Sequence, residues 1–280
     1  MSKQRLAGVL TQTQRATLMM AMIEDVLTAL AKVQGLTGRL LVTRDARLHA
    51  LAARYGAEVL CEHAPTSQQP ATYQPATYQP ATYQPATHQP ATHQPATQRT
   101  ATANAHATPS SPHERHREEN GTPENGLCRA LEEAASYLRD RGARGMLIVP
   151  GDVPLIDAAE INALLAQHHA QDSRVTIVPD RDCSGTNALL LSPPGCIGLR
   201  FGIDSCRRHT QSARDAGLSA SVVNLPSLAL DVDTAEDLAQ LRLRGQGTQA
   251  HAVLAKFYDG THANTFDEAR ARLNGSAPVI

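Results

Sequence analysis

Three aspartates stand where the sequence gives them no structural task. Asp152 follows the apolar run of "MLIVPGDVPLID", and Asp231 and Asp233 lie in "LALDVDTAEDL". The latter two would share one face of an extended segment, because side chains alternate there. Their neighbours are placed to cap helices, Asp157 in a capping box with Glu160 and Thr234 together with Asp237. The remaining carboxylates predict a site for Mg²⁺, which binds one or two carboxylates and takes further oxygens from water and phosphates.

Asp152 has one competing interpretation, a turn aspartate that hydrogen-bonds its own backbone. Its position favours a ligand instead, because ligands of open α/β sheets collect beyond the carboxyl ends of the strands. A magnesium site there predicts a substrate that carries phosphate groups. The sequence contains neither the GxxxxGK[ST] motif of P-loop ATPases nor the full GxGxxG motif of dinucleotide-binding oxidoreductases. These patterns favour a metal-dependent nucleotidyl transfer.

A second group of polar residues could receive a phosphorylated acid. In "IVPDRDCSGTNALLL", Gly185 and Thr186 can offer a backbone amide and a hydroxyl, and Gly202 and Ser205 can do the same in "RFGIDSCRRH". Ser205 precedes a predicted helix, whose N-terminus favours anions. The "RRH" stretch adds positive charge nearby, with a solvated helix face as the alternative.

The elements that must position these residues alternate between helices and strands. Apolar residues from Leu18 to Val33 recur at helical spacing. The pattern then predicts a strand at 39–43, a helix at 46–56, a strand at 57–61, a helix at 127–142, a strand at 146–150 and a helix after Asp157. This alternation predicts an α/β fold with a mostly parallel sheet flanked by helices.

A repeat interrupts this rhythm. From Gln69 to Gln98 the pentad Gln-Pro-Ala-Thr-Tyr occurs six times, with His or Gln replacing the last Tyr residues. Proline at every fifth position prevents both a helix and a central strand. We therefore predict a disordered insertion at residues 65–122, a single nucleotidyltransferase domain at 1–64 and 123–244, and a C-terminal extension at 245–280.

The overall composition indicates a soluble cytoplasmic protein. The chain has 280 residues, with 26 basic and 27 acidic ones and a formal net charge of -1, which gives no general bias toward nucleic acid or membranes. The N-terminus is too polar for a signal peptide, and no run approaches the roughly 18 apolar residues of a membrane span. The five cysteines form neither a CxxC pair nor an even set, as expected in a reducing compartment.

Four motifs, "VPGDVPL", "VPDRDCSGTNALLL", "RFGIDSCRRH" and "LALDVDTAEDL", follow one another along the chain. Their order and spacing resemble the guanylyltransferases of coenzyme F420 biosynthesis, from about Lys3 to Leu243 with the repeats set aside. The resemblance implies a Rossmann-like, GT-A-like nucleotidyltransferase fold. It also implies that GMP from GTP is joined to a small phosphorylated acid, namely 2-phospholactate, phosphoenolpyruvate or 3-phosphoglycerate, with release of pyrophosphate.

The same resemblance sorts the candidate residues by role. The implied metal ligands are Asp152, Asp231 and Asp233; the residues that hold the phosphorylated acid are Thr186, Gly202 and Ser205; those at the nucleotide are Lys3, Arg5 and Gly126. No separate acid or base is needed, because the acceptor phosphate has a second pKa of about 6 and is nucleophilic at neutral pH.

Two departures from the family pattern leave alternatives open. The family begins with a strand ahead of a "K-S-R-L" stretch, whereas "SKQRL" starts here at residue 2, so we expect either an upstream start or a sheet without that strand. Cys128 replaces an amide in "NGLCRAL", which leaves the preference for guanine open. A different sugar or cofactor nucleotidyltransferase, a non-catalytic nucleotide-binding homologue and a homodimeric assembly also remain open.

Overall fold

The computed structural model describes residues 4–61, 123–171 and 174–259. The chain divides into two units, residues 1–64 together with 122–280, and residues 65–121. The predicted repeat insertion at 65–122 lies outside the described residues, so its character stays a prediction. All helices and strands of the described residues belong to the first unit.

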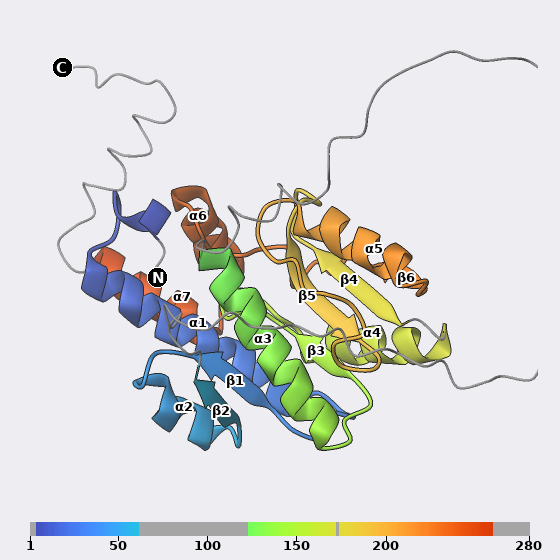
Figure 1. The fold of residues 1–280 in the computed structure, drawn as a ribbon. Coiled ribbons are helices and arrows are strands. Elements are labelled where there is room, and N and C mark those ends of the chain that lie inside the picture. The colour runs from blue at the N-terminus through green and yellow to red at the C-terminus, as the bar shows by residue number, and fades with distance from the viewer. Residues whose placement is uncertain (1–3, 62–122, 172–173, 260–280) are drawn as a thin grey trace, which may run out of the picture. The chain divides into compact units, whose positions relative to one another are not determined.

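Helices and strands alternate through this unit (Figure 1). The helices are η1 (Gln4–Leu6), α1 (Gln12–Lys32), α2 (Leu48–Arg54), α3 (Pro123–Asp140), α4 (Ala158–Ala170), α5 (Ser205–Asp215), α6 (Ala235–Arg244) and α7 (Gln249–Asp259). The strands are β1 (Leu40–Thr43), β2 (Glu58–Cys61), β3 (Met146–Ile148), β4 (Val175–Pro179), β5 (Thr186–Leu191) and β6 (Ala220–Val222). The predicted α/β class is confirmed.

The strands form two sheets within the described residues. β1 and β2 pair in parallel, while the second sheet has the order β3-β5-β4-β6. β4 and β6 are parallel, but β5 runs antiparallel to both β3 and β4. The connection between β4 and β5 is too short for the crossover that a parallel pair needs, so these strands form a hairpin. The sheet is therefore mixed at the strand that carries Thr186.

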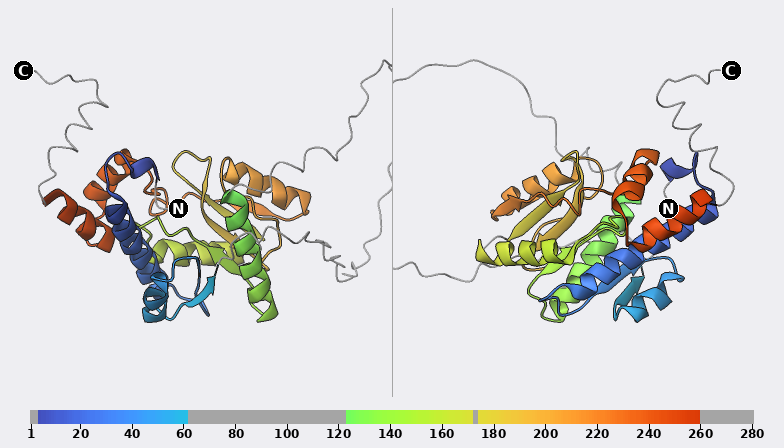
Figure 2. Two further views of the ribbon diagram at one scale, coloured as in Figure 1. Left: turned by 60° about the vertical axis from the view of Figure 1, so that its left-hand side comes forward. Right: turned by 180° about the vertical axis from the view of Figure 1, so that it is seen from behind.

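Helices cover both faces of the four-stranded sheet. One core cluster joins α3 and α5 to side chains of β3, β4 and β5, and a second joins α1 and α4 to the opposite side of β4 and β5. Alternation along β4 explains the two faces, because Ile177 belongs to the first cluster and Val178 to the second. The unit is a three-layer α/β/α arrangement (Figures 1 and 2).

Helix α7 extends the core past residue 244, where the sequence places the end of the domain. It packs along α1 (Figure 2), and its residues Ala250 and Leu254 are fully buried. The buried carboxylate of Asp25 in α1 accepts hydrogen bonds from the amides of Gln249 (2.7 Å) and Ala250 (2.8 Å). This carboxylate thus caps the start of α7, as anions do at helix N-termini.

The helix caps predicted from the sequence are present with one difference. Thr234 and Asp237 form the reciprocal capping box at the start of α6. Asp157 caps α4 through the amide of Ala159 at 2.6 Å, but Glu160 does not return the bond. Its carboxylate instead accepts from the hydroxyl (2.6 Å) and amide (3.1 Å) of Ser227. Glu160 therefore joins α4 to the segment that leads to the aspartates.

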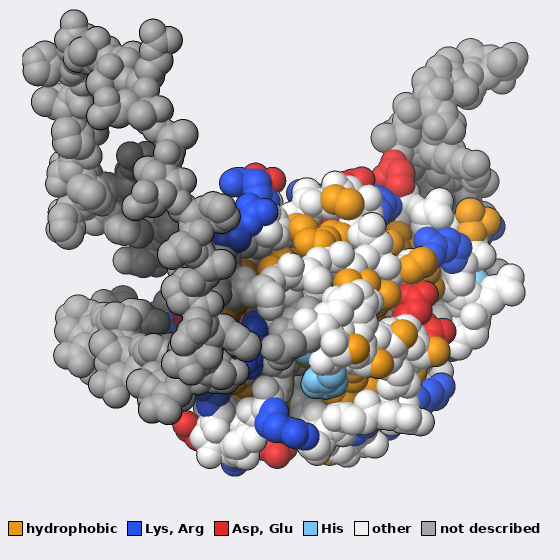
Figure 3. All heavy atoms as spheres, turned by 90° about the vertical axis from the view of Figure 1, so that its right-hand side faces the viewer, with side chains coloured by type: hydrophobic (Ala, Val, Ile, Leu, Met, Phe, Trp, Pro, Cys, Tyr) orange, Lys and Arg blue, Asp and Glu red, His pale blue; other side chains and the backbone are white. Residues whose placement is uncertain are grey.

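Surface charge is interspersed on the face seen in Figure 3, where Lys and Arg side chains stand among Asp, Glu and apolar ones. This mixture agrees with the formal net charge of -1. In the part of the chain that the structure describes, none of the helices has both the length and the apolar character to cross a membrane.

Candidate active site

Asp152 lies just beyond β3, in a loop held against two other parts of the fold. Gly151 lets this loop approach α1, because a Cβ there would lie 2.8 Å from Cγ1 of Ile23. The next residue, Val153, is fully buried. The carbonyl of Asp152 accepts a 3.0 Å hydrogen bond from the amide of Val232. The loop is therefore joined to the segment that carries the other two predicted metal ligands.

Asp231 and Asp233 share one side of their segment, as their spacing predicts, although it is assigned to neither helix nor strand. Leu230 and Val232 are buried, while the two carboxylates are partly exposed. Burial raises the pKa of Asp231, and the negative charges of Asp152 and Asp233 raise it further. Asp231 is thus close enough to Asp152 and to Asp233 for their charges to act on it.

A complete metal cage is not formed by side chains alone. Among residues 4–61, 123–171 and 174–259, no three or more His, Cys, Asp and Glu side chains are grouped so as to hold a metal ion. Magnesium does not require such a group, since one or two carboxylates suffice when phosphates and water supply the other oxygens. The assignment of the three aspartates to Mg²⁺ stays a prediction.

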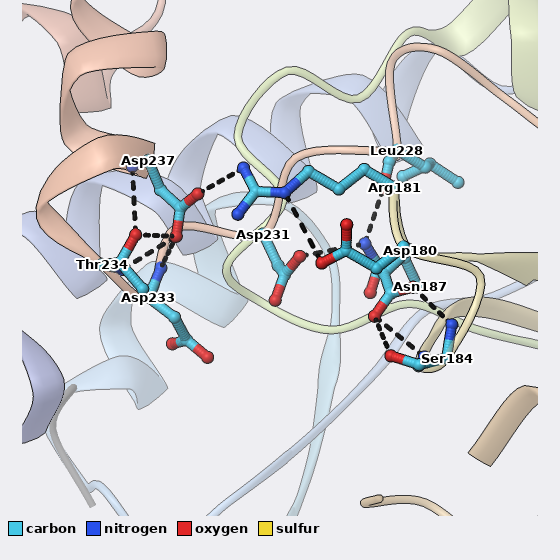
Figure 4. A network of polar contacts seen from close by, with 11 residues as sticks. Asp180, Arg181, Ser184, Asn187, Leu228, Asp231, Asp233, Thr234 and Asp237 are labelled. Atoms are coloured by element: carbon cyan, nitrogen blue, oxygen red, sulfur yellow. Dashed lines mark hydrogen bonds and ion pairs between the residues drawn. The ribbon is translucent and has the colours of Figure 1, made fainter. Parts of the chain in front are cut away.

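Asn187 is a site residue that the sequence analysis missed. Its side-chain Nδ2 donates to the Leu228 carbonyl at 2.7 Å and to Oδ1 of Asp231 at 3.4 Å (Figure 4). A bulge places it there, because Val178 pairs with Ala188 whereas Pro179 pairs with Thr186, which leaves Asn187 as the additional residue of β5. Bulges re-aim side chains near active sites. The available signal was its position directly after Thr186 in "SGTN".

Arg181 brings a positive charge to the same edge. Its Nη1 donates to Oδ1 of Asp237 at 2.7 Å (Figure 4), and the charge of Asp231 also acts on it. Burial favours the protonated form of Asp237, but hydrogen bonds from Asp233 and Thr234, just before α6, and from Arg181 hold its pKa below the ordinary value. Asp237, which also caps α6, thereby holds Arg181 in place. Nothing in the spacing of "VPDRD" predicts this contact.

The predicted acid-binding residues lie around the start of α5. Thr186 is the first residue of β5, and its Oγ1 lies 3.1 Å from Nδ1 of His209. Ser205 and His209 are four residues apart on α5 and both are buried, so they occupy one face of the helix. Gly202 is exposed in the preceding loop and adopts a φ of 104°. The structure therefore brings Thr186 and Ser205 into one region, with Gly202 at its rim.

Several amides suggested as anion donors are already used. The amide of Gly185 donates to Oδ2 of Asp180 at 2.8 Å. At the start of α5, the amide of Ser205 donates to the Gly202 carbonyl and that of Cys206 to the Ser184 carbonyl, both at 3.1 Å. The bond from Cys206 to Ser184 also ties the loop between β4 and β5 to α5. A ligand in this region would therefore be bound by side chains rather than by these amides.

His209 differs most from its sequence-based interpretation. The "RRH" stretch was expected to supply positive charge, but His209 is fully buried. Burial and the charges of Arg208 and Arg200 lower its pKa to about 4. It is therefore neutral at pH 7, and its contact with Thr186 is that of a neutral imidazole.

Two of the three residues predicted to bind the nucleotide, Arg5 and Gly126, lie within the described part of the chain. Lys3 lies outside the described residues, and Arg5 is exposed in η1. Gly126 lies in α3 near Cys128, a half-buried residue that packs against the core. Burial raises the pKa of the Cys128 thiol, which fits a packing residue better than a reactive thiolate.

Known proteins with similar sequences share one activity in their names. Residues 116–272 match the family described as "Guanylyl transferase CofC like". Phosphoenolpyruvate guanylyltransferase of Conexibacter woesei is 33% identical over 241 residues, which are 86% of this chain and 82% of that protein. 2-phospho-L-lactate guanylyltransferase of Methanothermobacter thermautotrophicus is 42% identical over 133 residues, which are 48% of this chain and 57% of that protein.

A third relative carries the third acceptor in its name. 3-phospho-D-glycerate guanylyltransferase of Colwellia psychrerythraea is 38% identical over 118 residues, which are 42% of this chain and 55% of that protein. Among solved structures, a protein of Desulfovibrio desulfuricans G20 provisionally named a nucleotide-diphospho-sugar transferase superposes with a TM-score of 0.58. Its sequence is 17% identical, with 95% of this chain and 90% of that chain covered, so it supports the nucleotidyltransferase fold alone.

Proposed function

The chain belongs to the CofC-like guanylyl transferase family, and we propose that it transfers GMP from GTP to a small phosphorylated three-carbon acid, a reaction of coenzyme F420 biosynthesis. The structural observation that carries this proposal is the hydrogen bond from the Val232 amide to the Asp152 carbonyl. It holds Asp152 beside Asp231 at one edge of the sheet. Thr186 and Asn187 open β5 at the same edge, so cation, nucleotide and acceptor sites would adjoin.

The reaction is a displacement at the α-phosphorus of GTP. An oxygen of the acceptor phosphate forms the new P–O bond, the bond from the α-phosphorus to the bridging oxygen breaks, and pyrophosphate leaves. The acceptor phosphate, with a second pKa of about 6, needs no general base at neutral pH. The protein's contribution is therefore to position the two substrates and to balance charge.

Asp152, Asp231 and Asp233 are the residues that would hold Mg²⁺. Their fit rests on the donor set, because carboxylate oxygens are the protein ligands that magnesium prefers. It also rests on the raised pKa of Asp231, which is caused first by burial and then by the negative charges of Asp152 and Asp233. A bound ion would neutralise negative charge on the phosphates as it develops. Asn187 orients Asp231 through its side-chain amide.

Positive charge at this edge comes from Arg181. Its guanidinium is held by the buried carboxylate of Asp237 at 2.7 Å, so the arginine has a fixed position before any substrate arrives. A preorganised cation beside Asp231 is suited to a phosphate of either substrate. Thr186 and Ser205, on the α5 side of the edge, provide hydroxyls for the acceptor.

The test of this function is to identify the product. The protein is incubated with Mg²⁺, each of the four nucleoside triphosphates in turn, and phosphoenolpyruvate, 2-phospholactate or 3-phosphoglycerate. ³¹P NMR should show a new phosphoanhydride and pyrophosphate with GTP and at least one acid. Binding of GTP without any new phosphoanhydride would support a non-catalytic homologue instead. Equal turnover with all four nucleotides would contradict the preference for guanine but would still support nucleotidyl transfer.

A further inference from the structure

His209 is a buried side chain that the proposed reaction does not yet use. It lies in α5 and is 0% exposed. The ring of Phe201 meets it edge to face, with the ring centroids 4.8 Å apart at 71°. Buried polar atoms are in most cases hydrogen-bonded, and both ring nitrogens of His209 have partners, which belong to different segments around the predicted acid site.

The two partners fix which ring nitrogen carries the proton. The backbone amide of Arg200 lies 3.0 Å from Nε2 of His209. An amide can only donate, so Nε2 accepts and is unprotonated. The proton of the neutral ring is then on Nδ1, which lies 3.1 Å from Oγ1 of Thr186. The histidine therefore donates to the threonine.

This direction determines what Thr186 can do. A hydroxyl has one proton and two acceptor lone pairs. Because one lone pair receives the Nδ1 proton, the proton of Thr186 must point to a different acceptor. The oxygens of a phosphate or carboxylate can only accept, so a hydroxyl fixed as a donor is what such a ligand needs.

We propose that His209 is a positioning residue that fixes Thr186 as a hydrogen-bond donor toward an anionic oxygen of the phosphorylated acid. This inference rests on the proposed function for the identity of that acid. The same imidazole holds the backbone at Arg200, two residues before Gly202, and so ties the rim of the site to β5. The charges of Arg208 and Arg200 act on the ring, and both favour its neutral form.

Two substitutions each remove one of the two hydrogen bonds of His209 and keep the other. His209→Asn keeps a donor near the position of Nδ1 and loses the acceptor for Arg200. His209→Gln keeps an acceptor near the position of Nε2 and loses the donor to Thr186. We expect His209→Gln and Thr186→Val each to raise the KM for the acid about tenfold, because one hydrogen bond to a charged group contributes a free energy of about that size. The KM for GTP should stay unchanged. Thr186→Ser should restore the wild-type KM.

His168 provides the matched control, because it is a buried histidine with a similar environment elsewhere. Its Nδ1 lies 2.8 Å from Oγ1 of Thr176 and its Nε2 lies 2.9 Å from Oγ of Ser192. His168→Asn should lower stability without changing either KM. If His209 acts through Thr186, combining His209→Gln with Thr186→Val should give no more than the larger single effect. Additive effects, or an unchanged KM for the acid in His209→Gln, would overturn the inference.

Two measurements keep the test independent of variant folding and of turnover. ¹⁵N NMR of the unmodified protein at pH 7 should show His209 with a protonated Nδ1 and an unprotonated Nε2; the opposite tautomer or an imidazolium would overturn the inference. Calorimetric binding of phosphoenolpyruvate should weaken about tenfold in His209→Gln and not in His168→Asn. If the wild type binds this acid yet releases no pyrophosphate, the proposed function is wrong. The role of His209 is then decided by comparing the binding affinities of the wild type and His209→Gln. Equal binding by His209→Gln and the wild type would contradict it.

Discussion

The amide of Val232 donates a 3.0 Å hydrogen bond to the carbonyl of Asp152. It joins the loop after β3 to the segment before α6, two parts of the chain that are far apart in sequence. Because Val232 stands between Asp231 and Asp233, this bond brings all three predicted metal ligands to one edge. The buried side chains of Val153 and Val232 fix both backbones, so packing of these two segments positions the backbone that carries the carboxylates.

Asn187 should be needed both for stability and for the position of Asp231. Asn187→Ala removes the donor to the buried Leu228 carbonyl, and an unsatisfied buried carbonyl costs about 1–3 kcal/mol. We expect urea unfolding to show a loss of that size, together with a higher Mg²⁺ concentration for half-maximal turnover. Asn162→Ala is the control, since Oδ1 of Asn162 accepts a 2.8 Å bond from the amide of Gln34 at an exposed site. If both variants lose the same stability, the bulge at Asn187 has no special role.

Much of this edge can be predicted from the sequence, and the reasons differ from residue to residue. The gathering of Asp152, Asp231 and Asp233 could be predicted because helix capping accounts for their neighbours and alternation places two of them together, while their role as metal ligands stays a prediction. Asn187 could not, because its orientation depends on a bulge that arises from pairing between β4 and β5. The apolar run of β5 does not by itself reveal the strand's direction, but the short connection from β4 is a signal in the sequence for an antiparallel pair.

His209 and Glu160 show a second limit of sequence reasoning. His209 belongs to a charged stretch that usually indicates a solvated helix face, and Glu160 stands at the position that completes a capping box. In the structure, their partners come from distant segments, Arg200 and Thr186 for His209 and Ser227 for Glu160. Tertiary contacts of this kind override local signals and are invisible in a single sequence.

The depressed pKa of His209 makes stability depend on pH. Its folded-state pKa is about 4, against an ordinary value of 6.5. As the pH falls through this window, the unfolded chain takes up the proton and the folded protein does not, so stability is present above pH 6.5 and is lost toward pH 4. The loss from this group reaches about 3 kcal/mol at most. His168 contributes in the same direction, because burial and then the charges of His169 and Arg174 lower its pKa.

The measurement is the free energy of unfolding between pH 4 and pH 7 for the wild type and for His209→Asn. The variant should have a flatter dependence, because asparagine does not titrate. His49→Asn, at an exposed position on α2, should retain the wild-type slope. A slope for His209→Asn that matches the wild type would show that folding does not lower the pKa of His209.

Asp25 should anchor α7 to the rest of the unit. Asp25→Ala leaves the amides of Gln249 and Ala250 without their acceptors, and we expect a loss of about 1–3 kcal/mol in unfolding free energy. Asp25→Asn, which retains one acceptor oxygen, should lie between the alanine variant and the wild type. Unchanged stability for Asp25→Ala would mean that α7 contributes little, despite the burial of Leu254.

The repeat insertion should be dispensable for turnover. Residues 66–120 are replaced by a short Gly/Ser linker between β2 and α3, and pyrophosphate release is compared with the full chain. The cost of closing a loop changes slowly with its length, so the shortened chain should fold at least as well. Lost turnover in a protein that still folds would show that the repeats take part in catalysis or in nucleotide binding.

The most direct test of the proposed metal site is pyrophosphate release by Asp152→Asn across a Mg²⁺ titration, with GTP and the phosphorylated acid saturating. The amide keeps the shape of the side chain but removes its charge, so we expect release to fall at least about a hundredfold while the fold persists. Asp157→Asn is the matched control five residues away, because asparagine caps α4 about as well as aspartate and should leave the rate unchanged. Equal rates for Asp152→Asn and the wild type at every Mg²⁺ concentration would contradict the proposal and return Asp152 to the role of a turn residue.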